Sequence, residues 1–303
     1  MKRGVLLSVL IGAGALSMSV AAQRGGPPPD NGPKVVEVDK IKDNLYVLKG
    51  GGGNTALFIT GNGAVVVDTK LPGWGQPLLE KIKTLTNKPI TTIINTHTHG
   101  DHVSGQIEFT GVNAEVVAHE NTKTNMQKLD PYKDPKNARL LPAKTFKDTM
   151  SLFSGNDKID LYYFGAGHTN GDAWVAFPAL RTVHAGDLFA GKSMPLVDFM
   201  NGGSGKAYGD TLAKAAAGLS GIDTIITGHA AKTMTMADLK EYAAFNKDFL
   251  TWMRGEQQAG KTAEQAAAEY KVPNKYTGYT ADLPPFFGGL KGYIQGIYDE
   301  LKK

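Results

Sequence analysis

Short apolar runs bounded by glycine, proline and polar residues recur along the first three quarters of the chain. Runs of this kind are typical of buried strands. We predict strands at 35–38, 45–48, 55–60, 64–68, 90–95, 115–119, 158–164, 174–177, 182–184 and 222–227. Gly61-Asn62-Gly63 separates two of them and favours a hairpin turn.

Apolar residues at helical spacing appear between some of these runs and dominate the end of the chain. We predict helices at 76–85, 120–128, 207–219, 235–258 and 262–272, and a final amphipathic segment through Leu290, Ile294, Ile297 and Leu301. Thr235 and Asp238 form a capping-box signature at the start of the longest one. Elements in this order predict a layered α/β domain over 35–234 and a helical extension over 235–303 packed on it.

Two connections have a composition of their own. The glycine-rich stretch 50–53 could be mistaken for a phosphate loop, but no Gly-Lys-Ser/Thr follows it and no helix begins there. A tight turn between strands is the better interpretation. The stretch 130–143 is polar and contains three prolines, which predicts a surface loop.

The N-terminus has the pattern of a secretory signal peptide over 1–22. Lys2 and Arg3 precede a short apolar segment that ends in small residues. A membrane anchor is the alternative, but the segment is short for that and contains glycines and serines. A Pro/Gly-rich leader, 23–34, follows and is predicted to be disordered. We therefore expect an exported protein, periplasmic or secreted, without stable membrane insertion after cleavage.

Composition narrows the possible partners and chemistry. The net charge of +4 is mild and the basic residues are scattered, which argues against a nucleic-acid surface and favours a small-molecule substrate. The chain has no cysteine, so disulfides, thiolate ligands and a cysteine nucleophile are all excluded.

Candidate chemistry is concentrated directly after the predicted strand 90–95. Three of the seven histidines and one carboxylate lie within six positions: His97, His99, Asp101 and His102. Imidazole and carboxylate groups are the ligands that zinc prefers when thiolates are absent. Two histidines two residues apart on an extended segment point the same way, and Gly100 lets the backbone aim the next pair elsewhere. This pattern predicts a metal site, and two metals rather than one.

Three further residues follow a glycine just beyond an apolar stretch: His168, Asp187 and His229. Each could be an ordinary turn residue when considered singly. Together with the histidine motif, they are candidate ligands that converge at strand ends. His119 and His184 lie within apolar runs and are interpreted as core or surface histidines.

The His-x-His-x-Asp-His motif and the separated His, Asp and His resemble those of the metallo-β-lactamase-fold metallohydrolases, over roughly Val35 to His229. The resemblance implies a four-layer αββα sandwich with the site at one edge. By position, it implies one metal held by His97, His99 and His168, a second held by Asp101, His102 and His229, and Asp187 between them.

The same resemblance implies a hydrolase with two zinc ions, iron or manganese being alternatives. A hydroxide bridging the metals would attack a carbonyl, because bound water ionises near neutral pH. Asp101 is a candidate catalytic residue that orients the nucleophile or moves its proton. Asp68, at a strand end, either orients a ligand imidazole or only ends the strand at a turn.

The substrate is predicted less directly. A β-lactam is the leading candidate, with lactones, esters and thioesters as others. Lys192, five residues after Asp187, is similar in placement to a lysine that binds the substrate carboxylate in one β-lactamase subclass. That subclass has a cysteine where Asp187 stands, so β-lactam hydrolysis could be incidental. Trp74, on a glycine-flanked loop, either grips an apolar substrate group or packs in the core.

Two other functions are compatible with the fold. One is an oxidoreductase with a single iron that acts on thiols or persulfides. The other is a binding protein without catalytic activity. The complete set of seven candidate ligands disfavours both.

Overall fold

Two β-sheets form the centre of the part of the chain that the structure describes. The computed structural model describes residues 33–285 and 288–302, and the chain from Pro33 onwards forms one compact unit. The predicted signal peptide, 1–22, and nearly all of the predicted leader, 23–34, lie outside the described residues.

The first sheet follows the order of the sequence. Its strands are β1 (Glu37–Lys42), β2 (Leu45–Lys49), β3 (Thr55–Ile59), β4 (Ala64–Val67), β5 (Ile90–Asn95), β6 (Glu115–His119) and β7 (Lys144–Phe146). Neighbours are antiparallel from β1 to β4 and parallel from β4 to β7.

The second sheet has the spatial order β12 (Thr224–Ile226), β11 (Thr182–His184), β10 (Trp174–Phe177), β9 (Ile159–Tyr162) and β8 (Thr149–Leu152). Only β11 and β12 are parallel neighbours in it. The predicted strands are confirmed, although the first begins two residues later than expected. The short strands β7 and β8 have no predicted counterpart, because their half-exposed sequences contain few apolar residues.

The α-helices are α1 (Gly75–Leu85), α2 (Gly100–Val103), α3 (Glu120–Met126), α4 (Asp130–Lys133), α5 (Gly205–Gly218), α6 (Met236–Gln258), α7 (Ala263–Glu269) and α8 (Gly289–Leu301). The 3-10 turns are η1 (Ser104–Glu108), η2 (Pro135–Leu140), η3 (Gly155–Asp157), η4 (Pro178–Leu180), η5 (Gly186–Phe189) and η6 (Phe199–Asn201). The prediction of a plain surface loop over 130–143 is wrong. Tyr132 anchors this segment, since its ring is buried and its hydroxyl donates to the carbonyl of Val103 at 2.6 Å.

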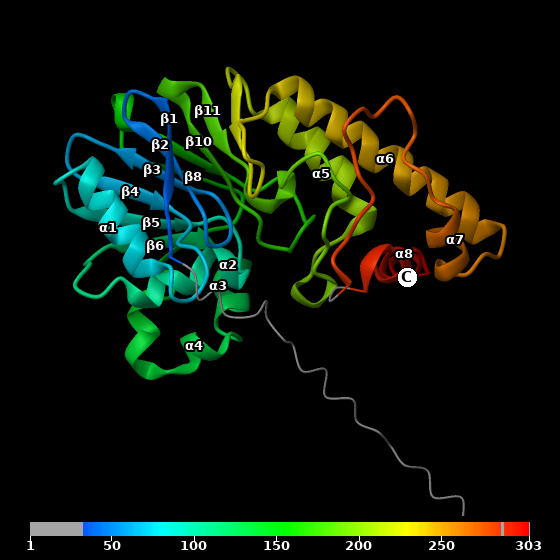
Figure 1. Cartoon of the computed structure of the whole chain (residues 1–303), viewed down its shortest axis with the longest axis horizontal. Coiled ribbons are helices and arrows are strands. Elements are labelled where there is room, and N and C mark those ends of the chain that lie inside the picture. Colours follow the sequence, from blue (N-terminus) through cyan, green and yellow to red (C-terminus); the bar gives the residue numbers. More distant parts are fainter. Residues whose placement is uncertain (1–32, 286–287, 303) are drawn as a thin grey trace, which may run out of the picture. The chain divides into compact units, whose positions relative to one another are not determined.

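Strand β4 shows how alternation of side chains builds the layers. Val65 and Val67 enter the core between the two sheets, while Ala64 and Val66 enter the core beneath α1. A strand buried on both faces has a continuous apolar sequence. Figure 1 shows α1 outside the first sheet, and α5 and α6 beyond the second. The predicted four-layer αββα sandwich is confirmed.

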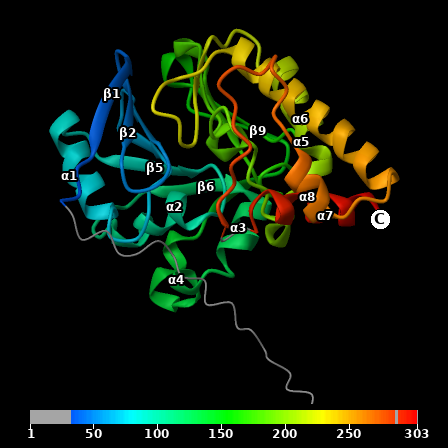
Figure 2. The ribbon, with the colours of Figure 1, turned by 45° about the vertical axis from the view of Figure 1, so that its right-hand side comes forward.

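The C-terminal helices share one core with the second sheet. Residues from β10, α5, α6 and α8 meet there, including Trp174, Leu212, Phe245 and Ile294. The predicted capping box is present, with Thr235 and Asp238 each bonded to the other's backbone. Figure 2 shows α7 and α8 beside each other near the end of α6. The division into a domain over 35–234 and an extension from residue 235 stays a prediction. Among the described helices, none combines the length and the apolar character needed to cross a membrane.

Candidate metal centre

The ends of three strands deliver most of the predicted ligands to one place. The histidine motif follows β5 of the first sheet, with α2 beginning at Gly100 inside it. Asp187 lies in η5 after β11, and His229 follows β12. Because β11 and β12 are parallel, their ends reach the same edge of the sheet. His168 arrives on the connection between β9 and β10.

The first ligand group consists of His97, His99, His168 and Asp187, whose ligand atoms all lie within 4.8 Å of one another. His168 Nε2 is 2.9 Å from His99 Nδ1. Asp187 Oδ2 is 3.6 Å from His168 Nε2 and 4.0 Å from His97 Nε2. These atoms form a small, almost fully buried cluster of nitrogen and oxygen donors.

The second ligand group consists of Asp101, His102 and His229. His229 Nε2 lies 3.3 Å from Asp101 Oδ2 and 3.4 Å from His102 Nε2. Asp187 contacts this group as well, because its Oδ1 is 3.2 Å from His102 Nε2. Its Oδ2 is 3.2 Å from His229 Nε2 and 3.6 Å from His168 Nε2, so the carboxylate of Asp187 stands between the two groups.

The donor atoms fit a pair of divalent cations. His97 Nε2 is buried and makes no hydrogen bond. A buried polar atom without a partner is costly, and a cation would satisfy it. Tetrahedral zinc with Zn–N bonds of about 2.0–2.1 Å separates two nitrogen ligands by roughly 3.3 Å. The imidazole pairs within the groups, at 2.9 and 3.4 Å, are close to that spacing.

Asp68 contacts the imidazole nitrogen of His102 that faces away from the second ligand group. Its Oδ2 is 2.7 Å from His102 Nδ1, and both residues are fully buried. The backbone and hydroxyl of Thr96 donate to the two oxygens of the same carboxylate, at 2.8 and 2.7 Å. This arrangement fixes the imidazole so that Nε2 faces the second group. Of the two alternatives for Asp68, the geometry matches the orienting role.

The residues that hold the outward nitrogens of the first group were not identified by the sequence analysis. Asp198 Oδ2 is 3.0 Å from His99 Nε2, and the carbonyl of Leu196 is 2.7 Å from His168 Nδ1. Asp198 also accepts the backbone N–H groups of Met200 and Asn201 in η6. Its only sequence signal is an aspartate that precedes a turn ending in Asn201-Gly202, which is a common N-cap pattern.

Burial keeps the imidazoles of His97 and His168 neutral. It holds the pKa of His97 well below its usual range and lowers the pKa of His168 to about 4. Neutral imidazole is the form that binds a metal ion. The first group is therefore ready for a cation at neutral pH.

The second group has the opposite character. Burial would lower the pKa of His102, but the carboxylates of Asp187, Asp101 and Asp68 outweigh it and raise that pKa well above the usual range. Asp187 also raises the pKa of His229 to about 9. Burial would raise the pKa of Asp101, yet His102 and His229 lower it to about 2. Without a cation, this group is a cluster of mutually stabilised charges.

The side chain of Lys192 is directed to α6. Its ammonium lies 2.9 Å from Asp238 Oδ1 and 3.1 Å from Glu241 Oε2, and 5.6 Å from the ring centre of Tyr279. The protein's own carboxylates therefore already neutralise the charge that we expected a substrate carboxylate to meet. Binding of substrate by Lys192 stays a prediction, and this pairing does not support it.

The exposed position considered for Trp74 is wrong, and the core alternative is confirmed. Its side chain is only 7% exposed and belongs to the core beneath α1. The ring packs against Gly51, where an added Cβ would lie 1.9 Å from a ring atom. A glycine at 51 thus makes room for the indole to fold inward.

The two remaining histidines among the described residues are structural. His119 is buried, stacks on Tyr163 with ring centres 4.1 Å apart and caps α3. His184 is fully buried, with Nε2 3.0 Å from the carbonyl of Asn54. Both were interpreted as core or surface histidines, and both lie in the core.

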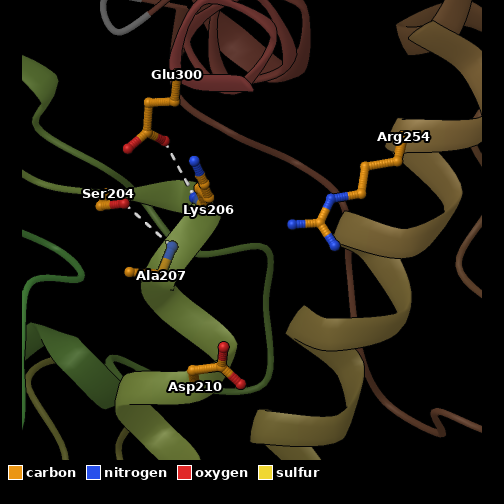
Figure 3. Close-up of a pocket in the computed structure, with 6 residues that line it drawn as sticks. All are labelled: Ser204, Lys206, Ala207, Asp210, Arg254 and Glu300. Carbon is orange, nitrogen blue, oxygen red and sulfur yellow. Dashed lines mark hydrogen bonds between the residues drawn. The ribbon is translucent and has the colours of Figure 1, made fainter. Parts of the chain in front are cut away.

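A cavity of about 530 Å³ lies at the start of α5, and none of the seven ligand residues lines it. Figure 3 shows its lining: Ser204, Lys206, Ala207, Asp210, Arg254 and Glu300. Ser204 accepts the N–H of Ala207, and Glu300 accepts the N–H of Lys206. The free N–H groups of the helix start are thus satisfied by the protein itself.

Comparison with known proteins identifies the family. Residues 48–242 match the model of the metallo-beta-lactamase superfamily, and the chain belongs to this superfamily of metal-dependent hydrolases. It is 27% identical over 188 residues to a metallo-beta-lactamase type 2 of Elizabethkingia meningoseptica, covering 57% of this chain and 68% of that one. It is 31% identical over 154 residues to a hydroxyacylglutathione hydrolase of Synechocystis sp., covering 50% and 51%.

Solved structures share the fold at low sequence identity. The DIM-1 metallo-beta-lactamase superimposes with a TM-score of 0.58 and 19% identity, over 70% of this chain and 97% of the other. The sec-alkylsulfatase Pisa1 from Pseudomonas sp. gives a TM-score of 0.70 and 15% identity, over 88% and 50%. A match over 88% of the chain necessarily extends into the helices after residue 235.

Proposed function

We propose that this protein is an exported hydrolase with two zinc ions that cleaves a carbonyl bond in a small molecule. The observation that carries the proposal is the position of the Asp187 carboxylate, which lies 3.2 Å from both His102 and His229 in the second ligand group and 3.6 Å from His168 in the first. His97, His99 and His168 would hold one ion, and Asp101, His102 and His229 the other, with Asp187 shared. Two cations there would supply a water of lowered pKa and polarise the substrate carbonyl.

The residues of the chain orient these groups and leave one side open. The side chains of His97, His102 and His168 are almost completely buried, whereas that of His229 is 40% exposed and that of Asp101 is 27% exposed. Substrate would therefore approach over the second ligand group. Asp101 Oδ2, on that side, is the candidate to hold or accept a proton near the reacting atoms.

The substrate class rests on family relationships. β-Lactams are the leading candidate, because a metallo-beta-lactamase is among the relatives. Asp187 at the shared position supports lactones, esters and thioesters as well, and a hydroxyacylglutathione hydrolase is another relative. Since the fold match to an alkylsulfatase extends into the C-terminal helices, a secondary alkyl sulfate belongs in any substrate panel.

The test combines metal analysis with a turnover panel. The panel contains a secondary alkyl sulfate together with four carbonyl substrates: nitrocefin, a carbapenem, a lactone and a thioester. Protein purified without added metal and then loaded with Zn²⁺ is expected to hold two ions per chain and to hydrolyse at least one of the four carbonyl substrates. One iron per chain, with oxidation of a thiol or persulfide, would instead support the oxidoreductase alternative. Zn²⁺-loaded protein that turns over none of the four carbonyl substrates would contradict the proposal.

Export is tested separately. The basic start and apolar segment of residues 1–22 support cleavage near Gln23. Mass spectrometry of protein from the periplasm or medium should find a mature N-terminus there. Recovery of chains that retain Met1 in the membrane fraction would contradict export.

A further inference from the structure

Lys70 is a fully buried lysine that the proposed chemistry does not use. It follows Asp68 and Thr69, which are also fully buried. Its Nζ donates to the carbonyls of Leu48 and Gly53, both at 2.9 Å. Burial lowers the pKa of Lys70 to about 7, which indicates how unfavourable an ammonium is at this position. We therefore looked to the contacts of Lys70 for the reason that a lysine is buried here.

The segment that Lys70 holds lies directly on the ligand motif. A Cβ added at Gly53 would lie 2.1 Å from Cε1 of the His102 ring, so only glycine allows this approach. At Gly52, where φ is 106°, an added Cβ would lie 2.6 Å from the carbonyl oxygen of Asp101. The backbone N–H of Gly53 donates to that same carbonyl at 3.1 Å. The glycine-rich connection 50–53 is thus a wall against Asp101 and His102.

The next residue extends this wall to the third member of the second ligand group. The backbone N–H of Asn54 donates to the carbonyl of Gly228 at 2.7 Å. The Asn54 amide donates to the carbonyls of Thr227 and Ala230, both at 3.0 Å. These three acceptors surround His229 in the sequence. Residues 52–54 therefore contact the backbone at both places from which the second group projects.

The segment 68–70 completes the enclosure of His102. Asp68 contacts its Nδ1, and the N–H and hydroxyl of Thr69 donate to its carbonyl at 2.6 and 3.1 Å. Asp68 and Lys70 have φ angles of 64° and 73°, in the left-handed region that non-glycine residues rarely adopt. Such strain persists where surrounding contacts fix the backbone, and it concentrates at functional sites.

We propose that Lys70 is a positioning residue for the second metal, acting by fastening the 50–54 connection against Asp101, His102 and His229. This inference rests on the proposed two-metal function. No atom of the first ligand group contacts the carbonyls of Leu48 and Gly53 among the hydrogen bonds of the described residues. The role therefore predicts an effect on one metal and not on the other.

The test is Lys70→Met, which keeps the length and volume of the side chain but removes the charge and all donors. Stepwise titration with Zn²⁺ against a chelator is expected to show the ion of the second ligand group, identified by comparison with His229→Ala, losing affinity by about 10- to 100-fold, the range found for residues that orient ligands. The ion of the first group is identified in the same way with His168→Ala. The affinity for that ion should change less than threefold. Co²⁺ spectra should resemble those of His229→Ala rather than those of His168→Ala.

Lys88→Met is the matched control. Lys88 is half-buried and also donates to two carbonyls, those of Thr60 and Gly61 at 2.6 and 2.9 Å, but beyond the opposite end of β3. The Lys88→Met protein should bind both ions with normal affinity, even if its melting temperature is lower. If Lys70→Met does not fold, Lys70→Gln, which keeps one donor group of two N–H bonds, is titrated in its place and should show a smaller loss in the same ion.

Two outcomes would overturn the inference. One is normal affinity for both ions in the Lys70 variant, and the other is equal weakening of both, which indicates general loss of structure. If the unmodified protein takes up only one Zn²⁺, the proposed two-metal function fails first. The two failures are therefore distinguishable in the same titration.

Discussion

The two ligand groups share Asp187 but are built in different ways. The first is buried, and the outward nitrogens of His99 and His168 are held by Asp198 and by a backbone carbonyl. Burial keeps the imidazoles of His97 and His168 neutral. The second is more open, and its charged groups stabilise one another. The first group therefore resembles a cavity prepared for a cation, whereas the second depends on the segments around it.

The largest effect is expected where the groups meet. Asp187→Ala removes the one carboxylate common to both, so hydrolysis should fall by about a thousandfold or more, beyond the 10- to 100-fold typical of orienting residues. Zn²⁺ content and turnover of the best panel substrate measure it. Asp223→Ala, at an exposed aspartate paired with Arg181, is the control and should remain active. Full activity of Asp187→Ala would refute a shared ligand.

The orienting carboxylates can separate the groups. Asp68→Asn should weaken the ion bound near His102, and Asp198→Asn the ion bound near His99, each by roughly 10- to 100-fold. Each substitution keeps the shape of the side chain while removing its charge. Stepwise Zn²⁺ titration of both variants provides the measurement. The comparison between the groups breaks down if both substitutions weaken the same ion.

Burial also favours the neutral form of Asp172, four residues after His168. This carboxyl accepts the backbone N–H of Thr169 at 2.8 Å, and burial raises its pKa to about 7. Unfolded chains lose this proton near pH 4. The stability that the group contributes is therefore fully present below pH 4 and is lost as the pH rises to 7.

Asp172→Asn should remove that dependence in the metal-free protein. The difference in unfolding free energy between the two proteins should change by about 3 kcal/mol from pH 4 to pH 7, with the unmodified protein losing stability relative to the variant. Urea unfolding at several pH values measures it. A difference that stays constant with pH would show that Asp172 ionises normally.

Much of this site was predictable because its signals are local. Histidines two residues apart at a strand end, and a glycine before each remote ligand, identify residues without knowledge of their contacts. The layers were predictable for the same reason, since the run Val65-Val66-Val67 indicates a strand buried on both faces.

The roles that could not be predicted from the sequence depend on contacts between segments that are separated along the chain. Asp198 contacts His99 across 99 positions, and Lys70 contacts Gly53 across 17. Nothing local distinguishes these residues from an ordinary turn aspartate and an ordinary lysine. The burial of Trp74 could not be predicted, because the space for its ring exists only where Gly51, in another connection, lacks a side chain. Residues that orient ligands are thus harder to predict than the ligands themselves.

Lys192 provides the smallest predicted effect and tests whether the C-terminal helices reach into catalysis. Its contacts with Asp238 and Glu241 join the loop after Asp187 to α6, and all three side chains are partly exposed. Partly exposed ion pairs contribute at most about 1 kcal/mol, so Lys192→Ala should lower the melting temperature by roughly 2–4 °C. Because its charge is already neutralised, the Michaelis constant for an anionic substrate should not change. An increase of about tenfold or more would instead show that substrate displaces the α6 carboxylates, and would extend the open second group toward the C-terminal helices.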